Sequence, residues 1–292
     1  MILKKNITKI FFLFLFFHLF LWALVPSISN TNLPLDTIEA LAWGSNLEWG
    51  FDKHPPLSAL AIELFYQIFG ANDWAYYLLS QIFVIVAFFF VWKLSNEIFE
   101  EKIYSLLSIL VLPSIYFYNF TTPEFNVNVS QLPFWALTIY FFWKGINSDN
   151  RINWVLFGIF SALGFLSKYL FIYILMSILI YFILNIKKLK KFITNYFLSI
   201  IISLVILTPH FVWLFKNNFA TIIYGLNRSA LTESTWVNHL ENPLIFSIKQ
   251  ILILIPFLIM IFILLKKIKL KFNLKNKKTL FLISINLIPI AL

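Results

Sequence analysis

The titratable side chains of this chain gather in one short part of an otherwise apolar sequence. Residues 50–56, GFDKHPP, place an acid, two bases and two prolines directly before the apolar run 57–65. Asp36 and Glu39 precede them, and their spacing puts both carboxylates on one face if residues 36–43 are helical. A carboxylate can take the proton of a hydroxyl group, and a lysine or histidine can pair with a phosphate. This part of the chain is therefore the first candidate for chemistry.

A structural interpretation of the two carboxylates is also open. Asp36 is well placed to cap the start of such a helix, with Glu39 in its first turn. Trp43, Trp49 and Trp74 flank the segment, and tryptophans alone indicate only a membrane interface. Together with the acids and the Lys-His-Pro-Pro turn, they favour a polar pocket with aromatic walls.

The composition is that of an integral membrane protein. The chain has 292 residues, of which 60% are hydrophobic and only 12% charged, against roughly 25% charged in soluble domains. Continuous apolar runs such as 10–25 and 169–184 approach the roughly 20 residues that cross a bilayer as a helix. We therefore predict an all-α, polytopic transmembrane helical bundle. The sequence has no cysteine, which excludes disulfides and thiol chemistry.

The apolar runs predict one transmembrane domain over residues 1–292, with long outer loops at 29–73 and 214–244. The first run lacks a small-residue cleavage site, so we expect a true span and not a signal peptide. The last run is too short to span, so we expect a partial domain, truncated at its C-terminal end. The predicted spans, about nine in number, are 10–28, 74–92, 103–118, 129–143, 154–167, 169–186, 192–213, 245–265 and one opening near 279.

The distribution of charge predicts the orientation of these spans. With the N-terminus in the cytoplasm, 18 of the 23 lysines and arginines fall in cytoplasmic loops, and nine of the 13 acids on the other side. The net charge of +10 is then a consequence of topology, and we expect no nucleic-acid partner. The sequence predicts a multi-pass protein of the cell inner membrane with its site on the periplasmic side. The basic stretch 266–278 is expected to face lipid headgroups, and a short helix over 57–68 to lie along the outer boundary.

Four segments carry a resemblance to a known family: LDTIEALAWGSNLEWGFDKHPPLSA, YNFTTPEFNVNVSQLPFWALTIYFFWKG, SALGFLSKYLFIY and TPHFVWLFKNNFATIIYG. In this order and spacing they resemble bacterial relatives of the dolichyl-phosphate-mannose protein mannosyltransferases, glycosyltransferase family 39, which include the lipid A aminoarabinose transferases. The resemblance covers about residues 8 to 230, and the loop with His-Pro-Pro is its most specific element.

The resemblance implies a C-type glycosyltransferase fold whose active site lies in the first outer loop. Such enzymes move a sugar from a polyprenyl phosphate to an acceptor at the membrane surface. The acid that opens the loop in the family matches Asp36, the expected catalytic base. Many members have a second acid directly after it; this chain has Thr37 there, and its next acid, Glu39, is the second candidate catalytic residue.

The leaving phosphate calls for cations, and the first loop offers Lys53 and His54. Aligned on the prolines, the acid and lysine of the aminoarabinose branch fall on Lys53 and His54, so Asp52 is displaced by one position. Lys168 and Arg228 come from other segments. Both are candidates for contact with the phosphate of the donor. Lys168 could instead extend to the lipid headgroups, and Arg228 could instead be an ordinary surface residue of its loop.

The third segment leaves two alignments open. Glu124 follows Thr-Pro, as the supporting acid of the family often does, but counting from Trp135 selects Asn128, with Asn126 beside it. An asparagine can bind a sugar but cannot act as a metal carboxylate. We therefore predict no cofactor and no metal residues, with a divalent ion left open. His18 and His210 are expected to be structural.

The sequence thus predicts a membrane glycosyltransferase. Its expected partners are a polyprenyl phosphate sugar donor, membrane lipids and an envelope acceptor, whether lipid A, another glycan or a protein. The alternatives are a transporter or flippase of lipid-linked sugars and an inactive truncated relative. A transporter usually holds charged residues at mid-membrane within repeats, whereas these spans carry almost no charge.

Overall fold

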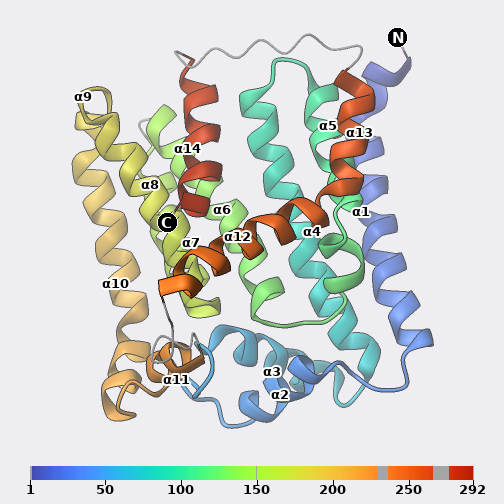
Figure 1. Ribbon diagram of the computed structural model, residues 1–292, viewed down its shortest axis with the longest axis vertical. Coiled ribbons are helices and arrows are strands. Elements are labelled where there is room, and N and C mark those ends of the chain that lie inside the picture. The colour runs from blue at the N-terminus through green and yellow to red at the C-terminus, as the bar shows by residue number, and fades with distance from the viewer. Residues whose placement is uncertain (1, 149, 229–235, 266–275, 292) are drawn as a thin grey trace.

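The structure is a computed structural model that describes residues 2–148, 150–228, 236–265 and 276–291. Every regular element in these ranges is helical, which confirms the predicted all-α membrane architecture (Figure 1). In chain order the elements are α1 (Ile2–Ser29), α2 (Leu35–Gly44), α3 (Leu57–Phe69), α4 (Asp73–Ile98), α5 (Lys102–Leu110), η1 (Leu112–Ser114), η2 (Phe117–Thr121), α6 (Val127–Asn147), α7 (Arg151–Ser167), η3 (Tyr169–Phe171), α8 (Ile172–Leu184), α9 (Ile186–Leu189), η4 (Lys190–Phe192), α10 (Ile193–Lys216), α11 (Ala220–Arg228), α12 (Trp236–Ile253), α13 (Ile255–Leu265) and α14 (Lys277–Ala291).

The bundle is a row of long helices that pack side by side. α6 packs between α4 and α7, α10 covers α7, α1 covers α4, and α14 lies against α8. Aromatic rings fill the contacts: Phe11 of α1 stacks on Trp92 of α4, with ring centroids 4.2 Å apart. Trp154 of α7 is fully buried beside Phe142 and Phe192. Large rings bury much apolar area, which suits helices whose side chains are nearly all hydrophobic.

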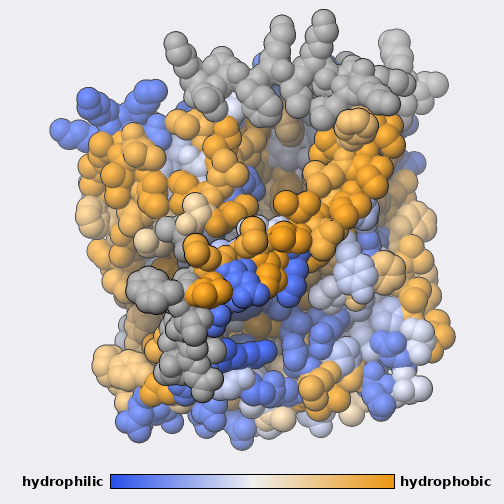
Figure 2. All heavy atoms as spheres, viewed as in Figure 1, coloured by the Kyte–Doolittle hydropathy of each residue, from blue (hydrophilic) through white to orange (hydrophobic). Residues whose placement is uncertain are grey.

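The short helices α2, α3 and α11 lie at one end of the bundle, at the bottom of Figure 1. We call this the first-loop end, since residues 30–72 form most of it. Figure 2 shows hydrophilic residues gathered there, below a band of hydrophobic surface. The predicted helix over 57–68 is α3, which begins after the prolines that fix the backbone of its first turn. α2 and α3 approach closely: a Cβ on Gly44 would lie 2.6 Å from the Ala59 carbonyl oxygen.

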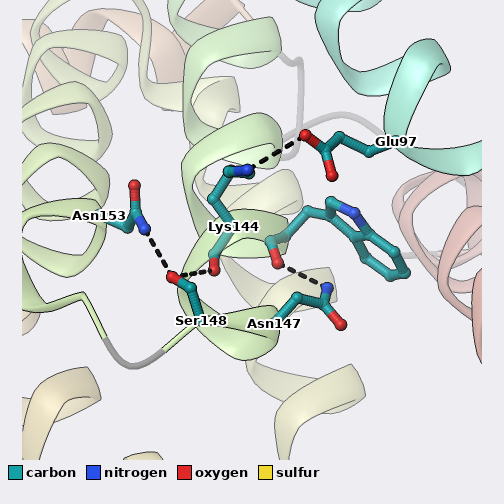
Figure 3. A network of polar contacts seen from close by, with 6 residues as sticks. Glu97, Lys144, Asn147, Ser148 and Asn153 are labelled. Atoms are coloured by element: carbon teal, nitrogen blue, oxygen red, sulfur yellow. Dashed lines mark hydrogen bonds and ion pairs between the residues drawn. The ribbon is translucent and has the colours of Figure 1, made fainter.

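Polar contacts tie the helices together at the opposite end, which we call the basic end (Figure 3). Lys144 of α6 donates to the carboxylate of Glu97 of α4 at 3.1 Å. Ser148 donates to the Lys144 carbonyl at 2.9 Å and accepts from Asn153 of α7 at 2.8 Å. The ion pair is partly exposed and contributes little energy. The contacts nevertheless fix the α6–α7 turn beside α4.

Two predicted spans are not continuous helices. The run 103–118 is broken after Leu110, and the short 3₁₀ turn that follows, Leu112–Ser114, contains Pro113. The run 245–265 is split at Leu254 into α12 and α13, which meet at 55° around Pro256. Proline lacks an N–H and clashes with the preceding turn, so it interrupts a helix even where the sequence is apolar.

By length and composition, three helical stretches of the described residues suit a membrane crossing, or four if the bent pair counts as one. They are Asn6–Ser29, Asp73–Ile98 and Ile186–Lys216, with the pair Leu240–Ile253 and Ile255–Ile263. The nine spans and the limits of the domain stay predictions. The predicted loop 266–278 lies mostly outside the described residues, as do residues 229–235 of the second outer loop.

The contact of α7 with α10 depends on Gly158. A Cβ there would lie 2.5 Å from the Ser199 carbonyl oxygen, a backbone atom, and Ser203 donates to the Gly158 carbonyl at 2.7 Å. We expect Gly158→Ala to destabilise the fold by about 1–3 kcal/mol through overpacking, read as a lower thermal midpoint in detergent. Gly225→Ala is the control, because nothing lies within 4 Å of the added Cβ. An unchanged midpoint for Gly158→Ala would contradict this packing.

Candidate active site

A cavity of about 1000 Å³ opens at the first-loop end. It lies between α2, the turn before α3, the start of α6, the α7–η3 junction and α11. Seven of the ten predicted site residues line it. The lining residues are Leu35, Asp36, Glu39, Lys53, His54, Pro55, Val127, Asn128, Lys168, Tyr169, Leu170, Thr221, Tyr224, Gly225 and Arg228.

Asp36 lies in the first turn of α2 with its side chain exposed to this cavity. The residue before the helix is Pro34, and no side chain caps the helix start. The alternative role of Asp36 as a cap is therefore wrong. Its Oδ2 instead accepts from Asn126 Nδ2 at 3.5 Å, and its backbone N–H donates to Glu124 Oε1 at 3.3 Å. The carboxylate thus faces the cavity with one weak partner.

The residues selected by both candidate alignments of the third segment, Glu124 in one and Asn126 and Asn128 in the other, lie at or beside the cavity. Asn126 caps α6: its Oδ1 accepts from the N–H groups of Asn128 and Val129 at 2.9 and 3.2 Å. Glu124 holds the backbone of Asp36 from behind, and burial followed by the charge of Asp36 raises the pKa of Glu124. Asn126 and Glu124 therefore support Asp36, while Asn128 turns into the cavity.

Glu39 and Lys53 form an ion pair across the cavity wall. Lys53 Nζ also lies 5.9 Å from the centroid of the Trp43 ring. The hydrogen bond with Glu39 is the main cause that raises the pKa of Lys53. Lys53 is therefore a fixed cation, and Glu39 is already occupied by it.

His54 and Lys168 approach the cavity from two different segments. Lys168 follows the end of α7, and its Nζ donates to Asn128 Oδ1 at 2.5 Å. Lys168 points into the site and not out to headgroups, and burial followed by the charge of Arg228 lowers its pKa. Burial, and then the charge of Lys168, lowers the pKa of His54. Burial thus favours the uncharged form of His54, in which the ring can still offer a phosphate an N–H group.

α11 forms the remaining wall of the cavity. Arg228 is exposed, and its Nη1 donates to the Tyr224 hydroxyl at 3.4 Å, one helical turn earlier. Thr221 is buried and donates to the Phe51 carbonyl at 2.6 Å, which fixes α11 to the first loop. The guanidinium of Arg228 is thus held at the mouth of the cavity, where a phosphate could reach it.

One predicted residue lies elsewhere. Asp52 is exposed and does not line the cavity, because the turn in which Phe51 N–H donates to the His54 carbonyl directs it outward. Sequence reasoning missed Tyr169, Thr221 and Tyr224. Tyr224 could have been found from its position four residues before Arg228, which places both side chains on one face of a helix.

His210 is a structural residue, as expected, and has a definite task. It is fully buried in α10, its Nδ1 lies 2.5 Å from the Trp49 carbonyl oxygen, and its Nε2 lies 2.8 Å from the Tyr169 hydroxyl. It joins the first loop to the segment that carries Lys168. Within the described part of the chain, no three His, Cys, Asp or Glu side chains converge as a metal site would require.

Fold and site together define a helical membrane protein with a charged cavity at one end of an apolar bundle. The family described as dolichyl-phosphate-mannose-protein mannosyltransferase matches residues 53–213, which is more than half of the 292 residues. The chain belongs to this family, which confirms the predicted resemblance. Membership makes it a membrane glycosyltransferase of the mannosyltransferase type. No curated protein and no solved structure matches the chain significantly.

The depressed pKa of His54 predicts a pH-dependent stability. The unfolded chain binds a proton at this residue more readily than the folded one, so stability is lost as the pH falls through the ordinary histidine value, about 6.5. We expect the thermal midpoint of the wild type to fall between pH 7.5 and 5.5 by more than that of His54→Gln. Lys168→Gln removes the repulsive charge and should reduce the fall as well. Equal falls in all three proteins would contradict the assignment.

Proposed function

We propose that this chain transfers a sugar from a polyprenyl phosphate to a hydroxyl of an envelope acceptor, with Asp36 as the general base. The observation that carries the proposal is the cavity that holds the Asp36 carboxylate together with Lys53, Lys168 and Arg228. A carboxylate can accept the proton of the attacking hydroxyl, while three cations stabilise the phosphate that leaves. The family match begins at residue 53, so the role of Asp36 rests on this geometry and on the sequence resemblance.

The step balances as a simple substitution. The acceptor oxygen bonds to the anomeric carbon of the sugar, and the bond from that carbon to the phosphate oxygen breaks. The electron pair leaves with the polyprenyl phosphate, and Asp36 takes the hydroxyl proton. Nucleophile and leaving group lie on opposite faces of the sugar in such a displacement. The acid and the cations would therefore occupy opposite sides of the bound sugar.

The walls of the cavity suit an amphiphilic donor. Leu35, Val127 and Leu170 contribute apolar surface beside the cations. A polyprenyl chain needs apolar contact, and its phosphate needs paired charge. The position of the cavity at an end of the bundle is compatible with each proposed acceptor, because lipid A, another glycan or a protein surface would reach it from outside the membrane.

The charge distribution supports a periplasmic site in an inner-membrane protein. Lys144, Arg151 and the lysines of α9 and η4 lie at the basic end, away from α2 and α3. Basic loops stay in the cytoplasm, which leaves the first-loop end outside.

Within the pair formed by Glu39 and Lys53, we assign Glu39 to positioning. Its carboxylate already accepts from Lys53, so a second role as a base would require this ion pair to break. Because the ion pair fixes the side-chain conformation of Lys53, its charge is already positioned at the cavity before a substrate binds.

Asp36→Asn removes the base and keeps the shape of the side chain. We expect transfer to fall by about 10²–10⁴-fold when purified protein is given a defined polyprenyl phosphate sugar and its acceptor. Asp52→Asn is the matched control: it removes an acid of the same loop outside the cavity and should leave the rate unchanged. Full activity of Asp36→Asn would contradict the mechanism. Movement of the donor across a bilayer without transfer would instead support a flippase.

The positioning role of Glu39 makes a separate prediction. Glu39→Gln should raise the KM for the donor more than it lowers kcat, since Lys53 is no longer held. Glu39→Gln and Lys53→Gln should be non-additive, because both break one ion pair, with a coupling of about 0.5–3 kcal/mol in a double-mutant cycle. A large fall in kcat with unchanged KM would show that Glu39 itself takes part in the chemistry.

A further inference from the structure

A second cavity lies at the basic end, far from the first loop. It has a volume of about 360 Å³ and opens between the end of α6, the α8–α9–η4 corner and the start of α14. Lys188, Lys191 and Lys277 line it together with the amides of Asn147 and Asn185. None of the described residues that line it is acidic. The site therefore concentrates positive charge without a carboxylate of its own.

The three lysines face one another across this cavity. Lys277 Nζ donates to Asn147 Oδ1 at 2.7 Å and lies 5.6 Å from the centroid of the Trp143 ring. Burial, followed by the charges of Lys191 and Lys188, lowers the pKa of Lys277. Like charges that converge in this way destabilise one another unless an anion lies between them. Glu97, at the same end, is occupied by Lys144 at 3.1 Å.

The other walls indicate which anion fits. Leu189 and Phe192 are buried beside the lysines, and Tyr181 and Leu280 also line the cavity. A small soluble anion gains nothing from such walls, whereas an amphiphile uses both kinds of surface. The cavity also lies where the apolar helix α8 ends and the apolar helix α14 begins, and the ends of such helices are where lipid headgroups are expected.

We propose that this cavity binds the phosphate headgroup of an anionic phospholipid. The phosphate lies between Lys188 of α9 and Lys277 of α14, and the glycerol part contacts the apolar wall. The lipid thereby links α14 to the α8–α9 corner. This link adds to the hydrogen bond that Lys278 Nζ donates to the Ile98 carbonyl at 2.8 Å. The site is separate from the proposed active site, and neither proposal depends on the other.

The test measures lipid retention by the purified full chain in detergent. Native mass spectrometry compares bound phosphatidylglycerol with bound phosphatidylcholine for the wild type and for the double variant Lys188→Gln/Lys277→Gln. We expect the wild type to prefer phosphatidylglycerol, and the preference to fall by about fivefold for each lysine removed. Lys187→Gln/Lys190→Gln removes two charges from the same corner, outside the cavity, and should keep the wild-type preference.

Two results would overturn the proposal. An equal loss in both double variants would show that general surface charge holds the lipid. Inorganic phosphate that displaces phosphatidylglycerol at the same affinity would show a site for free phosphate. The single variant Lys188→Gln separates loss of lipid binding from loss of folding. The Lys188 side chain is exposed, whereas Lys277 donates a hydrogen bond to Asn147 that its substitution would remove. The thermal midpoint of Lys188→Gln without lipid should equal that of the wild type, and phosphatidylglycerol should raise the midpoint of the wild type more than that of the variant.

Discussion

A charged side chain at the centre of a bilayer costs at least about 2.5–3.5 kcal/mol, and this cost determines where the protein can place chemistry. The long apolar helices form a scaffold of aromatic contacts and carry few charges. Acids and bases are moved to the two ends, where water and headgroups solvate them. A site built there must use loops and short helices, because the scaffold itself ends at that level. The geometry of the cavity at α2 and α11 therefore depends on the contacts that hold the first loop in place.

Those contacts are side chains that bind backbone carbonyls. Thr37 donates to the Phe125 carbonyl at 3.1 Å, and Thr221 does the same for Phe51 at 2.6 Å. His210 of α10 reaches the Trp49 carbonyl oxygen at 2.5 Å. A buried carbonyl without a partner is costly, so each of these bonds satisfies irregular backbone and fixes it to a helix at the same time. The loop that carries Asp36 and Lys53 is thus positioned by these side-chain bonds to its backbone, together with Glu124, which accepts from the Asp36 N–H at 3.3 Å.

The helical architecture could be predicted from the sequence, because apolar length needs no knowledge of side-chain packing. Seven residues of the first-loop cavity were predicted from their charge or polarity and from the family resemblance, whereas Tyr169, Thr221 and Tyr224 were not. The helix breaks at Pro113 and Pro256 could also have been predicted from the prolines in the sequence. Both segments were predicted as continuous spans because their apolar runs are long. The pairing of Glu39 with Lys53 could not be predicted, since it depends on the path of the loop between two helices. Asp52 shows the same limit: one turn in the backbone separates it from its neighbours in the cavity.

The two cavities differ in one respect that separates turnover from binding. Both place lysines beside apolar walls, and both therefore suit the phosphate of an amphiphile. Among the described residues that line these two cavities, carboxylates occur only at the first loop, and one of them, Asp36, has only a weak hydrogen bond to Asn126. A cavity of cations alone lowers the free energy of a bound phosphate, and a protonated lysine donates hydrogen bonds but does not accept a further proton. Adding a carboxylate weakens the binding of an anion through repulsion, a cost that is useful only where a proton must be taken. In the proposed function, Asp36 is therefore the residue that makes the first-loop cavity the reactive one.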